Sequence, residues 1–430
     1  MNRYFRLLVF CSAMLASTWC NAQKNAPVID VQEVQRIETV LASDDMRGRR
    51  AGTPDIDRAA AFIAEEFKKA GLVPVSGNSY LQSFSMLTPR FVNVKGEIDD
   101  EEIEGKNIIV ITTQPEVKID EKSGYEFHTI AAGDNLNTKA RGFARSGKNL
   151  VVFVDTSFSK NFPRLAGLKN LVFKMKNNVV FILGSYQPKS FKIKAEHTIN
   201  ETRYANVVGI LPGKSRKDEF VIFSGHYDHL GVARQPKGTD SIYNGANDNA
   251  AGTTAVIMLA NHFKKLANNE RTLVFAAFTA EEVGGFGARY FSEQYDPAKV
   301  MAMFNIEMIG TESKWGKNSA FITGYDKTNM GEILQKNLQG SSFTFYPDPF
   351  IKENLFYRSD NATLARLGVP AHTISTAKME GEPNYHQLSD EVGTLDLQNM
   401  AEIIKAIAIS SSSIISGKDT PTRVKPESLN

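Results

Sequence analysis

The pattern of apolar positions changes twice along the chain and divides it into three regions. In the first region, Ile29–Ser43 carries apolar residues at helical spacing, which predicts a helix. A second helix is predicted to begin at Pro54, with Thr53 as its N-cap, and its apolar stripe runs to Phe67. Gly71 then ends it. The chain therefore begins its folded part with two amphipathic helices.

The second region, residues 85–198, has a different texture. Short apolar runs at Ile108–Thr112, Leu150–Val154 and Val179–Leu183 are separated by polar, lysine-rich segments such as Glu116–Tyr125. Runs of this length predict short strands. The region therefore reads as a small β-rich insertion, and it contains no cluster of His, Asp and Glu that is typical of a site.

The third region alternates apolar runs of strand length with helical patterns. The predicted strands are Asn206–Leu211, Phe220–Ser224, Thr272–Phe278, Met301–Ile306 and Ala371–Ser375. The predicted helices are Ala250–Leu266, Gly287–Gln294, Thr328–Leu338, Ala362–Leu367 and Leu397–Ser410. Such alternation predicts the α/β class, as a three-layer α/β/α sandwich with a mostly parallel, mixed central sheet.

A chain of 430 residues exceeds one hydrophobic core, so we expect a main domain with an insertion. The predicted parts are a signal peptide at 1–22 and an amino-terminal helical part of the catalytic domain at 23–84. The β-rich insertion at 85–198, the core at 199–415 and a loose tail at 416–430 complete the chain.

The amino terminus has the pattern of a secretory signal peptide. The apolar run Leu7–Ala16 is too short to span a bilayer, and small residues around Asn21 offer a cleavage site before Gln23. A lipid anchor on Cys20 is the alternative, which the bulky Trp19 beside it disfavours. We therefore expect an exported protein, periplasmic or extracellular, without a membrane anchor after cleavage.

Cysteine content and charge exclude several classes of function. The only two cysteines, Cys11 and Cys20, lie in the predicted signal peptide, so the mature chain has no disulfide and no thiol ligand. Without Arg3 and Arg6 its basic and acidic residues are equal in number, and no charge block indicates a nucleic-acid partner. No later run is long and apolar enough to cross a membrane.

Two adjacent carboxylates, Glu281 and Glu282, follow the predicted strand Thr272–Phe278. Open α/β sheets place their sites outside the carboxyl ends of strands, so one glutamate could bind a metal ion while the other moves protons. The alternative is that both glutamates are solvated charges at the start of a helix. Taken without the rest of the chain, the two residues favour this alternative.

A second candidate follows the strand Phe220–Ser224. His226 and Asp228 lie two residues apart and share one face of an extended chain. Asp228 is placed to hold the other ring nitrogen of His226, or to bind a metal directly. By the same alternation His229 falls on the opposite side.

Three further polar residues occur at strand ends or in the loops between elements. Asp248 precedes an apolar helix and could cap it or bridge two metal ions. Glu307 interrupts an apolar strand end and should have a cation near it, and His386 lies in a polar loop. Histidines and carboxylates without cysteine suit two divalent ions, most plausibly zinc, that share an attacking water.

At this point a resemblance can be stated. The chain carries, in order, SGHYDHLG, NGANDNAAG, FTAEEVGG, FNIEMIG and YHQLSD. This series resembles the co-catalytic di-zinc exopeptidases of the bacterial leucyl aminopeptidase type, whose relatives include glutamate carboxypeptidase II and the glutaminyl cyclases. The resemblance covers Asn206–Ser410, and SDDMRGRRAGTPD resembles the family's amino-terminal stretch. It implies the zinc exopeptidase, phosphorylase/hydrolase-like fold.

The resemblance also implies a ligand set for two Zn²⁺ ions per chain. One ion would take His226 and Glu307, the other Glu282 and His386, and Asp248 would bridge them. The family often has Asp at the position of Glu307, so the charge is kept on a longer arm. Members commonly carry a protease-associated insert or lid, for which the segment 85–198 is the candidate here.

The catalytic roles follow from the same resemblance. Glu281 would be the general base, Tyr385 would steady the oxyanion, and the peptide bond between Asp248 and Asn249 would be cis. The implied function is that of an exported aminopeptidase acting on peptides. Carboxypeptidase or glutaminyl cyclase chemistry and a non-catalytic binding protein on this scaffold remain the alternatives.

Overall fold

The computed structural model describes residues 29–379 and 381–425, so the predicted signal peptide lies outside the described residues. The chain forms two compact units. We call residues up to Ser83 together with those from Ala205 the core unit, and Phe84–Tyr204 the inserted unit. The chain passes between the units inside two long strands, β2 (Leu81–Ile98) and β9 (Phe191–Leu211).

The core unit is built on a mixed sheet with the strand order β16-β15-β17-β14-β10-β13-β9. Its central strands β13, β10, β14 and β17 are parallel to one another. At the two ends of this group, β9 pairs antiparallel with β13 and β15 pairs antiparallel with β17. The bounds are β10 (Arg216–His226), β13 (Arg271–Phe278), β14 (Val300–Ile306), β15 (Ser319–Ile322), β16 (Thr344–Pro347) and β17 (Ala371–Ser375). The short β1 (Val73–Pro74) pairs with β9.

Both faces of this sheet are buried, as on β13, where every residue rather than every second one is buried. On β13, Phe275 belongs to the core on one face, whereas Val274 belongs to the core on the other. Phe223 of β10 stacks between Phe275 and Phe304, with ring centroids 5.6 and 4.9 Å away. This aromatic column holds the three central strands in register.

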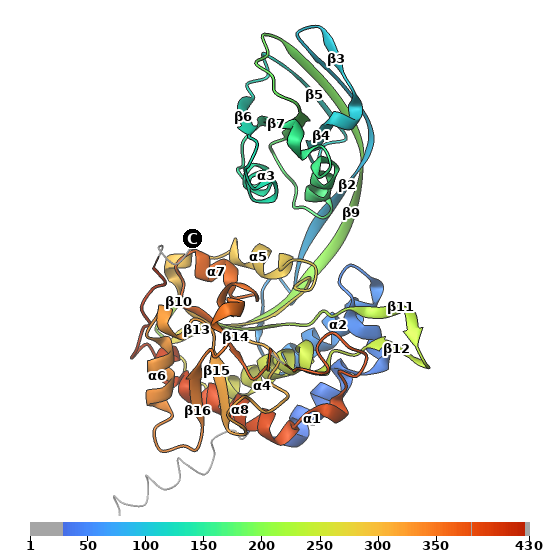
Figure 1. Cartoon of the computed structure of the whole chain (residues 1–430). Coiled ribbons are helices and arrows are strands. Elements are labelled where there is room, and N and C mark those ends of the chain that lie inside the picture. The colour runs from blue at the N-terminus through green and yellow to red at the C-terminus, as the bar shows by residue number, and fades with distance from the viewer. Residues whose placement is uncertain (1–28, 380, 426–430) are drawn as a thin grey trace, which may run out of the picture. The chain divides into compact units, whose positions relative to one another are not determined.

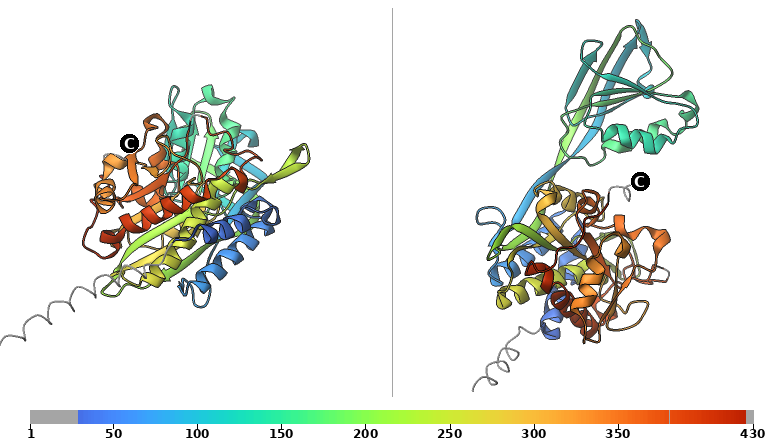
Figure 2. Two further views of the ribbon diagram at one scale, coloured as in Figure 1. Left: turned by 90° about the horizontal axis from the view of Figure 1, so that it is seen from below. Right: turned by 90° about the vertical axis from the view of Figure 1, so that its left-hand side faces the viewer.

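Helices cover both faces, as predicted for a three-layer α/β/α sandwich (Figure 1). One face carries α1 (Val31–Leu41), α2 (Pro54–Lys69), α4 (Ala251–Leu266), α6 (Met330–Asn337), α8 (Leu397–Ser410) and α9 (Ser412–Ile415). The other carries α5 (Phe286–Ser292) and α7 (Ala362–Arg366). Figure 2 shows α8, α4 and α1 side by side, and these helices contact one another.

Three features of the core unit differ from the expectation. Residues 417–425 are held rather than loose, since Arg423 donates to the Val300 carbonyl oxygen at 2.7 Å and Val424 is buried. The short strands β15 and β16 extend the sheet at one edge. A two-stranded hairpin, β11 (Gly231–Lys237) with β12 (Asp240–Tyr243), follows β10. Within the described residues, no helix combines the length and apolarity needed to cross a membrane.

The inserted unit has two strand layers and a helical layer. Its inner sheet has the order β4-β8-β7-β6, and the other layer contains β2, β3, β5 and the first part of β9. The bounds are β3 (Glu101–Ile103), β4 (Ile108–Ile111), β5 (Glu116–Asp120), β6 (Glu126–Ile130), β7 (Leu150–Val154), β8 (Val179–Leu183) and α3 (Leu136–Ala144). One core lies between the strand layers, and a second lies under α3.

The sequence interpretation of one segment in this unit was wrong. Glu116–Asp120, taken as part of a polar connection, is strand β5. Its Val117 and Ile119 are buried while Glu116 and Lys118 are exposed, which is the alternation of a strand with one wet face. The charged residues on the solvent-exposed face made the segment resemble a polar loop in the sequence. The likeness of this unit to a protease-associated domain stays a prediction.

Candidate metal centre

The predicted site residues meet where three neighbouring parallel strands end. β10 ends at His226, β13 ends at Phe278 just before Glu281 and Glu282, and β14 ends just before Glu307. Because β13, β10 and β14 are adjacent and parallel, their carboxyl ends lie at one edge of the sheet. The order of the strands therefore brings together side chains that lie far apart in the sequence.

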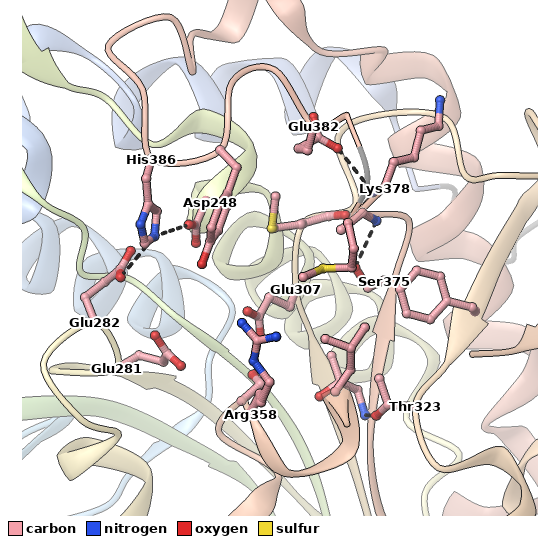
Figure 3. Close-up of a pocket in the computed structure, with 18 residues that line it drawn as sticks. Asp248, Glu281, Glu282, Glu307, Thr323, Arg358, Ser375, Lys378, Glu382 and His386 are labelled. Carbon is pink, nitrogen blue, oxygen red and sulfur yellow. Dashed lines mark hydrogen bonds and ion pairs between the residues drawn. The ribbon is translucent and has the colours of Figure 1, made fainter. Parts of the chain in front are cut away.

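Asp248 lies between two histidines, one near each carboxylate oxygen. His226 Nε2 is 3.3 Å from Asp248 Oδ1, and His386 Nε2 is 3.2 Å from Asp248 Oδ2. His386 Nε2 is also 3.2 Å from Glu282 Oε2. Figure 3 shows His386 pointing toward both carboxylates. Asp248 is thus the residue that connects the two halves of the cluster.

The peptide bond between Asp248 and Asn249 is cis, as predicted. The side chain of Asn249 ties this turn to β14: its Oδ1 accepts from the backbone N–H of Met308 at 3.0 Å, and its Nδ2 donates to the Ile306 carbonyl oxygen at 3.0 Å. Asp390 holds the turn from the other side, since its carboxylate accepts from the backbone N–H groups of Asn247 and Asp248.

Asp228 is buried and holds the two adjacent glutamates by their backbone. Its Oδ1 accepts from the Glu281 N–H at 3.1 Å, and its Oδ2 accepts from the Glu282 N–H at 3.3 Å. Its carboxylate lies 3.8 Å from His226 Nδ1, while that ring nitrogen is 3.2 Å from the Asp228 carbonyl oxygen. Asp228 therefore fixes the glutamate turn more directly than it fixes His226.

Glu281 and Glu307 line the same cavity, and their carboxylates point into it (Figure 3). Glu307 Oε2 accepts from the Ser359 hydroxyl, and Asn305 Nδ2 lies 3.5 Å from it. Burial, together with the nearby carboxylates Glu307 and Asp360, raises the pKa of Glu281 well above its ordinary value. An unprotonated Glu281 in this setting is a base that attracts a proton strongly.

The cluster carries more buried acid than base. Both carboxylate oxygens of Asp360 are buried without a hydrogen-bond partner, and burial raises its pKa to about 8. Hydrogen bonds to Asp248 and Glu282 raise the pKa of His386 to about 10. Histidine nitrogens and carboxylate oxygens are zinc ligands, and an excess of buried negative charge calls for a cation. The donor set fits divalent metal ions, zinc above all.

The contacts also fit tetrahedral zinc in their spacing. Ligand atoms about 2.0–2.2 Å from a tetrahedral ion lie roughly 3.4 Å from one another. The separations from Asp248 to His226, from Asp248 to His386 and from His386 to Glu282 are 3.2–3.3 Å. The side chains are therefore arranged with the spacing of a ligand set.

His229 was placed wrongly by the sequence analysis. Its Nδ1 lies 2.9 Å from Glu282 Oε1 and 4.0 Å from Asp248 Oδ2, so it faces the cluster rather than away from it. The side-chain alternation of a strand applies only within the strand, and β10 ends at His226. No spacing rule places His229; the hydrogen bond from its N–H to the Arg49 carbonyl oxygen, at 3.2 Å, shows how the chain turns there.

Tyr385 stacks on the neighbouring ligand candidate. Its ring centroid is 3.9 Å from that of His386, with the planes 19° apart, and the side chain is 42% exposed. Tyr385 also lines the cavity. Its hydroxyl is therefore available to a molecule that enters from solvent.

The cavity has a volume of about 150 Å³ and is lined by both charged and apolar residues. The apolar residues that line it are Met308, Phe321, Leu355, Ala377 and Met379. Arg358, Lys378 and Glu382 also border it (Figure 3). The site thus combines a charged end, suited to metal and water, with space for a substrate side chain.

Comparison with known proteins finds similarity to peptidases. Residues 206–410 match the sequence model of peptidase family M28. Aminopeptidase YwaD of Bacillus subtilis is 24% identical over 260 residues, which are 56% of this chain and 51% of YwaD. A probable zinc metalloprotease of Pyrenophora teres f. teres is 33% identical over 120 residues, 27% of this chain and 24% of that protein. The chain thus spans about half or less of these relatives.

Solved structures resemble the fold. An aminopeptidase from Aneurinibacillus sp. strain AM-1 aligns with a TM-score of 0.53 at 17% identity, covering 90% of this chain and 94% of that one. The zinc aminopeptidase BSAP from Bacillus subtilis gives 0.53 at 16% identity, with 92% and 98% covered. At these identities the likeness concerns the fold.

Proposed function

Because residues 206–410 belong to peptidase family M28, we propose that this chain is a zinc-dependent aminopeptidase that removes residues from peptide amino termini. One observation carries the proposal: Asp248 has a histidine nitrogen 3.2–3.3 Å from each of its oxygens, in a cavity that Glu281 also lines. The aminopeptidases among the similar proteins support the choice of reaction.

Two zinc ions would be held by this chain's own side chains. His226 and Glu307 would bind one ion, Glu282 and His386 the other, and Asp248 both. Zinc in such a site polarises the carbonyl group of the substrate and makes water acidic enough to react near neutral pH. The buried carboxylates that lack partners in the structure would then have a cation beside them.

Glu281 would move the proton. Its carboxylate takes a proton from the attacking water while the water oxygen forms a bond to the peptide carbonyl carbon. The same oxygen of Glu281 then delivers the proton to the amine nitrogen as the carbon–nitrogen bond breaks. Burial and the neighbouring acids, which raise the pKa of this carboxyl, favour its taking the proton.

Tyr385 and the apolar wall would orient the substrate. Tyr385, which is partly exposed and lines the cavity, would donate a hydrogen bond from its hydroxyl to the oxyanion formed during attack. The wall around Met308 and Phe321 would accept the side chain of the amino-terminal residue. We therefore expect apolar amino-terminal residues to be preferred over charged ones.

We propose further that the protein is exported. The proposal rests on the signal-peptide pattern of residues 1–22 in the sequence alone. Cell fractionation with amino-terminal sequencing of the mature protein tests it. Gln23 as the first residue outside the cytoplasm is the expected result, and an intact Met1 in the cytoplasm would contradict it.

Substrate profiling of the purified protein, with metal analysis of the same sample, tests the activity. The panel contains aminoacyl and peptidyl fluorogenic substrates, each with a matched N-acetylated control. We expect cleavage only where the α-amino group is free, and about two zinc ions per chain. Apolar residues such as leucine should be cleaved faster than aspartate or lysine.

Other outcomes would replace the proposal. Release of carboxyl-terminal residues from N-acetylated peptides would indicate a carboxypeptidase, and cyclisation of amino-terminal glutamine would indicate a glutaminyl cyclase. Zinc binding without any turnover would indicate a binding protein on this scaffold.

A further inference from the structure

His229 lies against the site although it has no place in the proposed ligand set. The residue is 1% exposed, and its Nδ1 is 2.9 Å from Glu282 Oε1. His386 Nε2 lies 3.2 Å from the other oxygen of the same carboxylate, Oε2. The two oxygens of Glu282 thus face two different histidines.

The two histidines lie differently between the carboxylates of Asp248 and Glu282, and the ligand atoms of His229, Asp248 and Glu282 all lie within 4.8 Å of one another. His386 Nε2 lies 3.2 Å from both Asp248 Oδ2 and Glu282 Oε2, close to the spacing of roughly 3.4 Å between atoms around one tetrahedral ion. His229 Nδ1 is nearer than that to Glu282, at 2.9 Å, and farther from Asp248, at 4.0 Å. His229 is thus within hydrogen-bond distance of Glu282 alone, whereas His386 lies equally near Glu282 and Asp248.

The direction of this hydrogen bond follows from the groups involved. A carboxylate oxygen can only accept, so the neutral His229 ring must carry its proton on Nδ1. With that proton on Nδ1, Nε2 is a lone-pair nitrogen, and it is buried without a partner in the described structure. Among the described residues, the ring nitrogens of His229 therefore form one hydrogen bond, the one to Glu282.

The backbone around His229 is built to hold this ring in place. A Cβ atom on Gly245, whose φ is +56°, would lie 2.5 Å from two ring carbons of His229, so only glycine leaves room for it. The backbone N–H of His229 donates to the carbonyl oxygen of Arg49 at 3.2 Å. The buried guanidinium of Arg49 in turn donates to the carbonyl oxygens of Tyr227, Asn244 and Gly245.

We propose that His229 is a positioning residue for the zinc ligand Glu282. Its Nδ1–H holds Oε1, so that Glu282 presents only Oε2 beside His386 and Asp248. The carboxylate then contributes one oxygen in a fixed orientation and leaves a position open on the ion for water or substrate. This inference rests on the proposed zinc site, but it concerns a residue that the ligand set does not contain.

Zinc affinity of two variants of nearly equal shape tests the proposal. His229→Asn keeps an N–H donor near the position of Nδ1, whereas His229→Leu fills the same space without a donor. Competition with a chromophoric chelator should show one of the two zinc ions bound about 10–100-fold more weakly by His229→Leu. His229→Asn should keep most of the wild-type zinc affinity. His128→Leu, which removes a surface histidine 3.5 Å from Glu126, is the control and should bind zinc normally.

Cobalt substitution distinguishes positioning from direct ligation. If His229 only positions Glu282, the visible absorption of the Co²⁺-loaded His229→Asn variant should match that of the wild type, because the ligands are unchanged. A weaker, shifted spectrum or complete loss of one ion in His229→Asn would make His229 a ligand and overturn the proposal. Equal zinc affinity of His229→Leu and wild type would also overturn it.

A double variant covers the case in which His229→Leu folds poorly. On a Glu282→Gln background His229→Leu should weaken zinc binding no further, because the residue acts through Glu282. An additional loss in the double variant would contradict the proposal. A wild-type protein that binds no zinc would instead refute the proposed function, so the two failures are distinguishable.

Discussion

The two units of the molecule bury charged groups in opposite ways. In the inserted unit, Lys169 and His197 are each 5% exposed, and Lys169 Nζ lies 2.9 Å from His197 Nε2 and 3.1 Å from the Val110 carbonyl oxygen. Burial lowers the pKa of Lys169 to about 8, and burial with the charge of Lys169 lowers that of His197 to about 4. Among the described residues, no carboxylate forms an ion pair with this lysine.

The core unit gathers acids and bases and keeps several of them charged. Although burial opposes it, hydrogen bonds from His226 and His386 hold the pKa of Asp248 below its ordinary value. At the same time Asp360 stays buried with both oxygens unpartnered. In the inserted unit, burial favours loss of the lysine proton and therefore removal of charge. The core unit instead gathers several buried carboxyl groups around its histidines, an arrangement that a bound cation would stabilise. This difference supports the proposal that the acids and histidines of the core unit form a metal site.

The largest effect should come from Glu281, the acid assigned to proton transfer. Glu281→Gln keeps the size of the side chain and removes the base, so turnover should fall about 10²–10⁴-fold while the zinc content is unchanged. Steady-state kinetics and metal analysis of the same sample measure both. Glu282→Gln is the matched comparison one residue away, and it should lower zinc affinity instead. Near-normal turnover of Glu281→Gln with both ions bound would refute the assigned mechanism.

A smaller effect is expected at Asp228, which holds the glutamate turn without touching substrate. In Asp228→Asn one acceptor becomes an N–H₂ group that faces a backbone N–H, so the turn loses a hydrogen bond. We expect zinc affinity or kcat/KM to fall about 10–100-fold. Asp57→Asn, an exposed acid on α2, should change neither. Identical behaviour of the two variants would show that Asp228 does not position the site.

The smallest effect lies in the inserted unit and concerns stability alone. The folded pKa of Lys169 is about 8 and the ordinary value is 10.5, so between these pH values the unfolded unit binds more protons. The stability of the unit should therefore rise by roughly 1–3 kcal/mol from pH 8 to pH 10.5 and lose this contribution below pH 8. Lys169→Met should abolish the rise without changing peptidase activity.

Proteolysis in increasing urea, with fragments within 84–204 identified by mass, measures the stability of this unit at each pH. Lys160→Met, which removes an exposed lysine, serves as the control and should keep the rise. A rise of the same size in Lys169→Met would mean that another group titrates. The claim that burial of Lys169 makes the stability of the inserted unit depend on pH would then be wrong.

Much of the core unit was predictable because its elements are apolar at every buried position. In the core unit, the predicted strand Ala371–Ser375 and helix Leu397–Ser410 have the observed bounds. In the inserted unit, the same is true of the predicted strands Leu150–Val154 and Val179–Leu183. The segment Glu116–Asp120 was missed because its wet face carries charges. Short strands near the edge of the sheet, such as β15, depend on their neighbours for pairing, and their sequence alone does not predict them.

The site was predictable in part, for a similar reason. Residues that directly follow a strand, such as His226 and Glu307, are placed by the strand itself. Residues beyond a turn are not, since their direction depends on contacts with distant segments. His229 is directed by the Arg49 carbonyl and the space at Gly245, and Asp390 by the amides of Asn247 and Asp248. Such contacts exist only in the folded chain.

Counting zinc ions bound to the metal-free protein tests the central claim most directly. Native mass spectrometry during a zinc titration should show two ions per chain for the wild type. For Asp248→Asn, which alters the residue between both histidines, it should show weaker binding of both ions. No zinc on the wild type, or two ions of unchanged affinity on Asp248→Asn, would contradict the claim that the buried acids of the core unit form a two-metal site.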